Sequence, residues 1–190
     1  MILISAGHNP SAKGACNGDI CEWDIAINWI EIISKHLTIA DVPNRIVPTG
    51  KLSDKVSFIN SKKPDIAIEL HFNSNINAAG SETLYYPGSK KGKELASTIQ
   101  GEFVNNCIFM PDRGIKEGWY KMDRPGIVDY SGDVDGDETI DYFLRKTSCT
   151  AVIVEPQFIY NLKNIEQHES LGCLSIATGL MKYWLNNFNQ

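Results

Sequence analysis

The sequence predicts an α/β fold: a three-layer α/β/α sandwich whose mostly parallel, roughly six-stranded mixed sheet is covered by helices on both faces. Short apolar runs such as MILISA, IAIEL and AVIV indicate buried strands. Amphipathic segments with helical spacing lie between these runs, and this alternation is typical of a covered parallel sheet. With 190 residues and 43% hydrophobic content, the chain can bury one core, so we expect a single domain over 1–190.

The first quarter of the chain predicts a strand, a loop and a helix. Residues 1–6 form the first apolar run, and the stretch NPSAKGACNGD after it is rich in Gly, Asn and Ser, which indicates a loop. A helix is expected over 22–37, because apolar residues recur there at helical spacing. The expected buried face consists of Ala26, Trp29, Ile30, Ile33 and Leu37.

The elements that follow alternate in the same way. Residues 44–47 predict a short strand, and 51–60 a helix that stops at a Lys-Lys-Pro break. Residues 66–70 predict a buried strand, followed by the polar loop FNSNINAAGS and a strand over 82–86.

The second half adds two helices and one strand. A long helix is expected over 91–107, with Leu95, Ile99 and Phe103 on its buried face. Residues 151–154 predict the last strand, and 165–188 a terminal helix. The core residues expected on that terminal helix are Leu171, Leu174, Ala177, Met181 and Trp184.

One region departs from the alternating pattern, and we predict a loop insertion over 116–142. Asp133, Asp135 and Asp137 occupy alternate positions there, and carboxylates spaced in this way can converge on calcium. However, Glu138 stands where such a loop needs glycine for its sharp turn, and Leu144 where it needs an acidic ligand. A solvated acidic loop is therefore the preferred interpretation over a calcium site.

Composition excludes several classes of function. The net charge is −5 and the basic residues are scattered, which argues against a nucleic-acid partner. No apolar stretch reaches the length of a membrane span. Met1 leads directly into the first strand without a basic or apolar leader, so we predict no signal peptide and synthesis in the cytoplasm. If the protein acts outside the cell, another factor must release it.

The five cysteines are an odd number without regular spacing: Cys16, Cys21, Cys107, Cys149 and Cys173. A cytoplasmic origin predicts reduced thiols. Cys16 and Cys21 flank the loop that leads to Glu22, so a thiolate ligand for a metal is conceivable. Because this pair has no second pair to match it, we interpret both as ordinary small residues.

Four polar residues carry the functional prediction: His8, Glu22, His71 and Glu155. Three of them end apolar runs and Glu22 opens a helix, and ligands of an open α/β sheet bind outside the carboxyl ends of its strands. Two imidazoles and one carboxylate can hold a zinc ion and leave its fourth position to water, while a further carboxylate can act as general base. Taken singly, each histidine would be a satisfied polar residue at a strand end. The four together favour a metal site.

Six ordered segments resemble the zinc-dependent N-acetylmuramoyl-L-alanine amidases of the amidase type 3 family, which occur in bacterial cell-wall remodelling enzymes and phage endolysins. These segments are ILISAGHNPSAKGA, Glu22 with its following helix, ELHFNSN, GSETLYYPGS, DRGIK and FLRKTSCTAVIVEPQFIYN. The similarity runs from residue 2 to about residue 185. It implies that His8, Glu22 and His71 ligate one zinc ion per chain and that Glu155 is the catalytic carboxylate.

The resemblance also implies the substrate. This is peptidoglycan, cut at the amide between the lactyl group of N-acetylmuramic acid and the L-alanine of the stem peptide. Asn73 is placed to hydrogen-bond that peptide, whereas surface ion pairing is the preferred role for Arg113 and Arg145. Pro156 departs from the family pattern, but an extended strand end at Glu155 satisfies the bias that proline imposes. Together with the missing signal peptide, the resemblance favours a phage endolysin.

Two other functions stay open from the sequence alone. A zinc carboxypeptidase or another peptidase could act on wall peptides, but such enzymes usually place their His and Glu ligands three residues apart. A non-catalytic peptidoglycan-binding module would be expected to lose a ligand or the base, and here all four residues are present.

Overall fold

The computed structural model describes residues 1–118 and 140–188. Within these ranges the chain forms a six-stranded sheet with the strand order β4-β1-β5-β8-β6-β7, and every neighbouring pair is parallel except β6 and β8. In that order the strands are Asn44–Ile46, Ile2–Ala6, Ile66–Leu70, Thr150–Glu155, Ser81–Tyr85 and Asp112–Glu117. The mostly parallel mixed sheet predicted from the sequence is confirmed.

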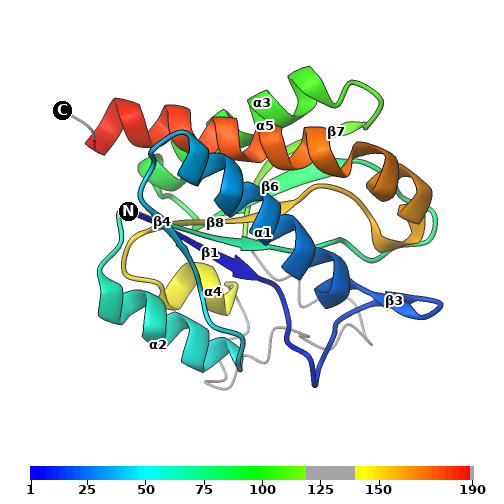
Figure 1. Cartoon of the computed structure of the whole chain (residues 1–190), viewed down its shortest axis with the longest axis horizontal. Coiled ribbons are helices and arrows are strands. Elements are labelled where there is room, and N and C mark those ends of the chain that lie inside the picture. The colour runs from blue at the N-terminus through cyan, green and yellow to red at the C-terminus, as the bar shows by residue number, and fades with distance from the viewer. Residues whose placement is uncertain (119–139, 189–190) are drawn as a thin grey trace.

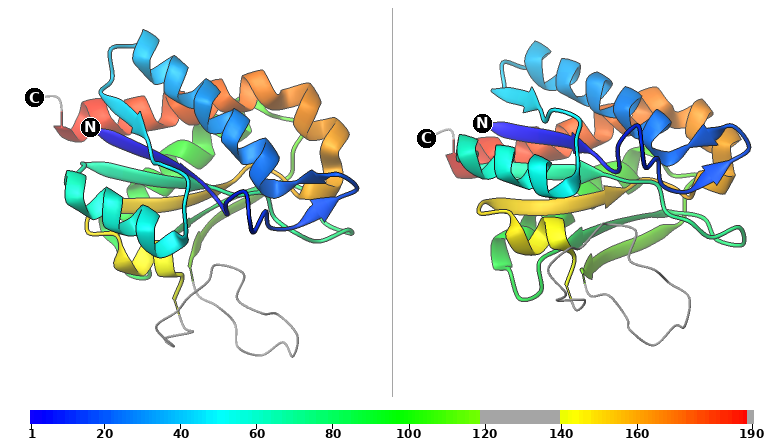
Figure 2. Two further views of the ribbon diagram at one scale, coloured as in Figure 1. Left: turned by 60° about the horizontal axis from the view of Figure 1, so that its bottom comes forward. Right: turned by 90° about the horizontal axis from the view of Figure 1, so that it is seen from below.

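Helices cover both faces of this sheet (Figure 1). The first face packs against α1 (Glu22–Ile39), α3 (Lys90–Asn106) and α5 (Leu162–Phe188), and the second packs against α2 (Leu52–Lys62) and α4 (Tyr142–Lys146). The two further views separate the three layers (Figure 2). No helix in the described ranges is long and apolar enough to span a bilayer.

Strand alternation decides which side chains enter which layer. Along β1, Ile2 and Ile4 belong to the core under α1, α3 and α5, whereas Leu3 belongs to the core under α2 and α4. On β5, Ile68 follows the first pattern and Ala67 the second. The buried strands are therefore apolar on both faces, which is why they appear as continuous apolar runs in the sequence.

Several elements lie outside the sequence prediction. The edge strand β7 and helix α4 border the predicted insertion, and a short hairpin joins β2 (Cys16–Asn17) to β3 (Ile20–Cys21). A 3₁₀ turn, Ile159–Asn161, precedes α5. The possible calcium ligands Asp133, Asp135 and Asp137 lie outside the described residues. The preference for a solvated acidic loop over a calcium site therefore stays a prediction.

The expected core face of α5 was partly wrong. Leu171 and Leu174 are exposed, whereas Ala177 is buried. The buried stripe runs instead through small residues such as Gly172 and Gly179. A Cβ on Gly172 would lie 2.8 Å from the Trp29 ring. The close approach of α5 to α1 and α3 requires these small residues. A search for hydrophobic periodicity does not count glycine as a core residue, so this face of α5 was not predicted.

The core gives a direct stability prediction. Ile33 is fully buried in α1, whereas Ile39 at the end of the same helix is 72% exposed. Replacing Ile33 with alanine is expected to lower the free energy of unfolding by about 2–5 kcal/mol, because it removes buried methyl groups and leaves a cavity. The matched Ile39→Ala variant should change it by about 0.5 kcal/mol or less. Urea denaturation of both variants measures the difference, and equal midpoints would contradict the packing of α1.

Candidate metal centre

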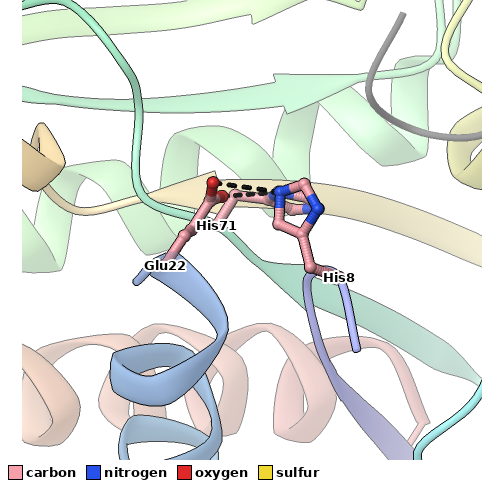
Figure 3. A group of neighbouring side chains, drawn as sticks. All are labelled: His8, Glu22 and His71. Atoms are coloured by element: carbon pink, nitrogen blue, oxygen red, sulfur yellow. Dashed lines mark hydrogen bonds and ion pairs between the residues drawn. The ribbon is translucent and has the colours of Figure 1, made fainter. Parts of the chain in front are cut away.

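Three of the predicted residues meet at the carboxyl edge of the sheet (Figure 3). His8 follows β1, His71 follows β5, and Glu22 is the first residue of α1. Because β1 and β5 are parallel neighbours, the chain leaves both strands at the same edge. One potential ligand atom from each of the three residues lies within 4.8 Å of the others. A His-Glu-His group that could hold a metal ion is therefore present.

Glu22 is the centre of this group. Its Oε2 lies 3.0 Å from His8 Nε2, its Oε1 lies 2.9 Å from His71 Nδ1, and Oε1 also accepts a hydrogen bond from the Phe72 N–H at 2.9 Å. Burial alone would raise the pKa of Glu22, but hydrogen bonds with His71 and His8 lower it to about 2. The buried carboxylate is thus ionised and attracts a cation.

The electrostatics of His71 follow from the same contacts. Burial alone would lower the pKa of His71, but hydrogen bonds with Glu22 and Glu69 raise it well above its ordinary value. A metal ion bound here would have to displace a proton from the imidazole, since only the neutral ring coordinates.

Two glycines make room for the ligand side chains. A Cβ on Gly7 would lie 2.6 Å from the His71 ring. A Cβ on Gly14, whose φ is +78°, would lie 2.5 Å from the His8 ring and 2.6 Å from Glu22 Oε2. The loop between His8 and Glu22 therefore needs glycine at position 14 for close approach as well as for its backbone conformation.

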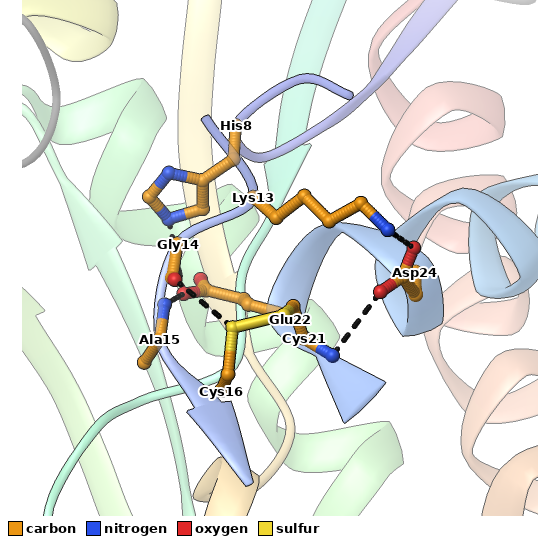
Figure 4. Close-up of a disulfide and its surroundings, with 8 residues drawn as sticks. All are labelled: His8, Lys13, Gly14, Ala15, Cys16, Cys21, Glu22 and Asp24. Atoms are coloured by element: carbon orange, nitrogen blue, oxygen red, sulfur yellow. Dashed lines mark hydrogen bonds and ion pairs between the residues drawn. A yellow bond between two sulfur atoms is a disulfide. The ribbon is translucent and has the colours of Figure 1, made fainter. Parts of the chain in front are cut away.

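A disulfide joins Cys16 and Cys21 just before Glu22 (Figure 4). This corrects the expectation of reduced thiols for these two residues, and bonded sulfurs cannot serve as thiolate ligands. The two cysteines are direct partners in the β2–β3 hairpin, a proximity that their linear spacing does not reveal. Cys107, Cys149 and Cys173 are free. The hairpin also fixes Glu22, whose N–H donates to the Ala15 carbonyl at 2.8 Å.

Glu155 ends β8 and lies opposite Glu82 in the antiparallel β6–β8 pairing. The Asn73 side-chain amide donates to both carboxylates, to Glu155 Oε2 at 2.6 Å and to Glu82 Oε1 at 3.0 Å. On its other side, Glu82 pairs with Arg113 at 2.6 Å and with Lys116. Two adjacent carboxylates repel each other, and these donors offset that repulsion.

The surroundings of Glu155 and Glu82 shift the pKa values of the two carboxylates in opposite directions. Burial, followed by the charge of Glu82, raises the pKa of Glu155 to about 8. For Glu82, burial alone would also raise the pKa, but hydrogen bonds from Lys116 and Arg113 lower it. In the metal-free protein Glu155 can therefore exchange a proton near neutral pH while Glu82 stays ionised. Glu155 is thus the carboxylate of this pair whose surroundings favour proton uptake, which makes it the candidate acid–base group.

The family described as N-acetylmuramoyl-L-alanine amidase matches residues 2–172 of the chain. The chain belongs to this amidase family. Its activity is that of a peptidoglycan amidase, in agreement with the resemblance of the six ordered segments.

One relative by sequence and two solved structures match the chain over most of its length. The amidase is 27% identical to the Bacillus subtilis (strain 168) protein YqiI over 199 aligned positions, which cover 96% of the chain and 84% of YqiI. The crystal structure of an N-acetylmuramoyl-L-alanine amidase from Clostridium difficile 630 superposes with a TM-score of 0.78 at 20% identity, covering 98% of the chain and 97% of that protein. The catalytic domain of the CD27L endolysin targeting Clostridia difficile superposes with a TM-score of 0.69 at 26% identity, covering 97% and 96% of the two chains.

Sequence reasoning named Glu82 and Glu69 only as alternative bases and did not identify the partners that place them in two groups around the amidase site. The first is Glu82 with its cationic partners. The second is a buried pair, Lys55 and Glu69, in contact with His71 through Glu69. Burial alone would raise the pKa of Glu69, but the charge of Lys55 and a hydrogen bond with His71 lower it to about 2. The sequence did contain a signal for this pair, namely a glutamate inside the apolar run IAIEL. A charged residue in a buried strand requires a partner of opposite charge.

A pair of glycine variants tests the packing of the amidase site. Gly14 and Gly18 both have positive φ, +78° and +63°, but a Cβ on Gly18 meets nothing within 4 Å. Gly14→Ala is expected to displace His8 and Glu22 and to weaken metal binding at least about tenfold, since small ligand displacements are costly. Gly18→Ala should show only the backbone strain that both share. Zinc titration of both variants is the measurement, and equal affinities would contradict the close packing at Gly14.

Proposed function

We propose that this amidase is zinc-dependent and cleaves the amide between the lactyl group of N-acetylmuramic acid and the L-alanine of the stem peptide. The observation that carries the proposal is the His-Glu-His group, with Glu155 at the end of β8, the parallel neighbour of the strand that leads to His71. Two imidazoles and one carboxylate, with ligand atoms within 4.8 Å of one another, form a donor set that suits zinc. His8, Glu22 and His71 would hold the ion, and three protein ligands leave a coordination position for water.

A zinc ion held by His8, Glu22 and His71 would supply Lewis-acid chemistry for the reaction. Glu155 accepts a proton from the attacking water and delivers it to the leaving nitrogen of L-alanine. The hydroxyl adds to the lactyl carbonyl carbon, the carbon–nitrogen bond breaks, and the amine leaves with the transferred proton. Asn73 holds the Glu155 carboxylate in place through its 2.6 Å hydrogen bond.

The substrate contact expected of Asn73 stays a prediction. Its amide nitrogen already donates to Glu155 and Glu82, and its Oδ1 accepts from the Ser74 N–H at 2.8 Å. A stem peptide would compete with these partners. We therefore assign Asn73 first to positioning Glu155, with contact to the peptide as a second role.

We further propose that the protein acts as an endolysin in host lysis and reaches the wall with the help of another factor. The similarity to the CD27L endolysin domain over almost the whole chain supports this role. The proposal predicts lysis of intact bacteria when the protein is added from outside.

Digestion of purified peptidoglycan tests the proposed reaction. We expect new L-alanine amino groups without new reducing sugars, and loss of this release after chelation by EDTA with recovery on adding Zn²⁺. Release of single C-terminal residues would indicate a carboxypeptidase, and no release would indicate a binding module. Full activity in the chelated protein would contradict the zinc dependence.

A further inference from the structure

A buried ion pair lies beside the proposed metal ligands, on the sheet face covered by α2. Glu69 in β5 is 2% exposed and Lys55 in α2 is 4% exposed. Removing two charges from water is costly, and well-packed apolar residues often stabilise a fold equally well or better. Stability alone therefore gives no sufficient reason for placing this pair under the sheet edge.

Glu69 contacts His71 on the side that faces away from the metal group. Its Oε2 lies 3.2 Å from His71 Nε2, while His71 Nδ1 lies 2.9 Å from Glu22. The other oxygen of Glu69 accepts hydrogen bonds from Lys55 and, at 3.1 Å, from the Ser5 hydroxyl. Both ring nitrogens of His71 therefore face carboxylates, Nε2 towards Glu69 and Nδ1 towards Glu22. If Nδ1 coordinates a metal ion beside Glu22, Nε2 keeps its proton and donates it to Glu69, because a carboxylate paired with an ammonium group only accepts hydrogen bonds.

Lys55 also hydrogen-bonds to the backbone around the other histidine, His8. Its ammonium group donates to the Ala6 carbonyl at 2.8 Å and to the His8 carbonyl at 3.4 Å, so it bridges the two sides of Gly7. His8 itself has a φ of +62°, in the left-handed region that few residues other than glycine adopt. One ammonium group thus binds both the turn that carries His8 and the carboxylate that orients His71.

We propose that Lys55 and Glu69 form a positioning pair that sets the tautomer of His71 and the turn of His8, and thereby the metal affinity of the site. This inference rests on the proposed role of the two histidines as zinc ligands. A carboxylate behind a coordinating imidazole fixes its orientation and increases its basicity, and loss of such a partner typically reduces metal affinity about 10–100-fold.

The test uses three variants of the full chain: Glu69→Gln, Lys55→Met and the double variant. We measure the zinc dissociation constant by competition with a chromophoric chelator and the melting temperature of the metal-free protein. The single variants leave one buried charge without its partner and are expected to melt earlier. The double variant removes both charges, so its melting temperature should recover, while its zinc affinity stays about 10–100-fold below that of the wild type.

A second readout addresses His71 directly. ¹⁵N NMR of the zinc-loaded protein should show coordination through Nδ1 with the Nε2–H tautomer in the wild type, and a mixture of tautomers in the double variant. A merely structural pair would not change this signature.

The matched control is Gln100→Met. Gln100 is buried and hydrogen-bonded to Thr83, Ser81 and Asp112, and none of these partners belongs to the metal group. This variant should lower the melting temperature without changing zinc affinity. Wild-type zinc affinity and an unchanged tautomer in the double variant would overturn the positioning role while leaving the proposed function intact. A wild-type protein that binds no zinc would overturn the proposed function, and the positioning role with it.

Discussion

His71→Ala is expected to remove zinc and hydrolytic activity together while leaving the fold in place. In the proposed site the imidazole would supply one of three protein ligands, and its Nδ1 lies 2.9 Å from the Glu22 carboxylate. Two remaining ligands bind zinc poorly, because a catalytic site requires three. The sheet core consists of apolar residues and does not depend on the ion, so unfolding should remain cooperative. Metal content after dialysis and release of amino groups from peptidoglycan measure the two losses.

His36→Ala is the matched control for this variant. His36 lies in the last turn of α1, outside the metal group, so its replacement should leave about one zinc ion per chain and normal hydrolysis. Full zinc occupancy in His71→Ala would show that the assignment of this ligand is wrong.

The second large effect is expected from Glu155→Gln. Glutamine keeps the size of the side chain and can still hydrogen-bond to Asn73, but it cannot accept a proton. Loss of a general base typically costs about 10²–10⁴ in rate. We expect a folded protein with full zinc occupancy that still binds peptidoglycan fragments and hydrolyses them at least about a hundredfold more slowly.

Glu166→Gln is the matched control, because it removes a carboxylate from the exposed side of α5, outside the metal group. This variant should retain activity. If Glu155→Gln loses its zinc, Glu155 is a ligand and the division of roles is wrong. If it keeps near-normal activity, another carboxylate is the base. Glu82 would then be the first candidate, because it shares Asn73 with Glu155.

Much of the fold could be predicted because its signals are local. The strand over 66–70 has the same bounds in the structure, and α1 begins at Glu22 as expected. Side-chain alternation and helical periodicity depend only on near neighbours along the chain, so they are visible in the sequence. The edge strand β7 was missed because DRGIKE has no buried residue and carries no apolar run.

The sequence by itself determined the α/β class, the order of most elements and the three residues that meet at the carboxyl ends of the strands. Strand ends can be located from local patterns, and parallel neighbours place their ends together. Only the tertiary structure decided which side chains are partners. The pairing of Glu155 with Glu82, of Glu69 with Lys55, and of Cys16 with Cys21 depends on register and packing between separate segments. A charged residue within an apolar run of the sequence predicts that a partner exists. Which residue that partner is depends on contacts between segments that lie far apart in the sequence.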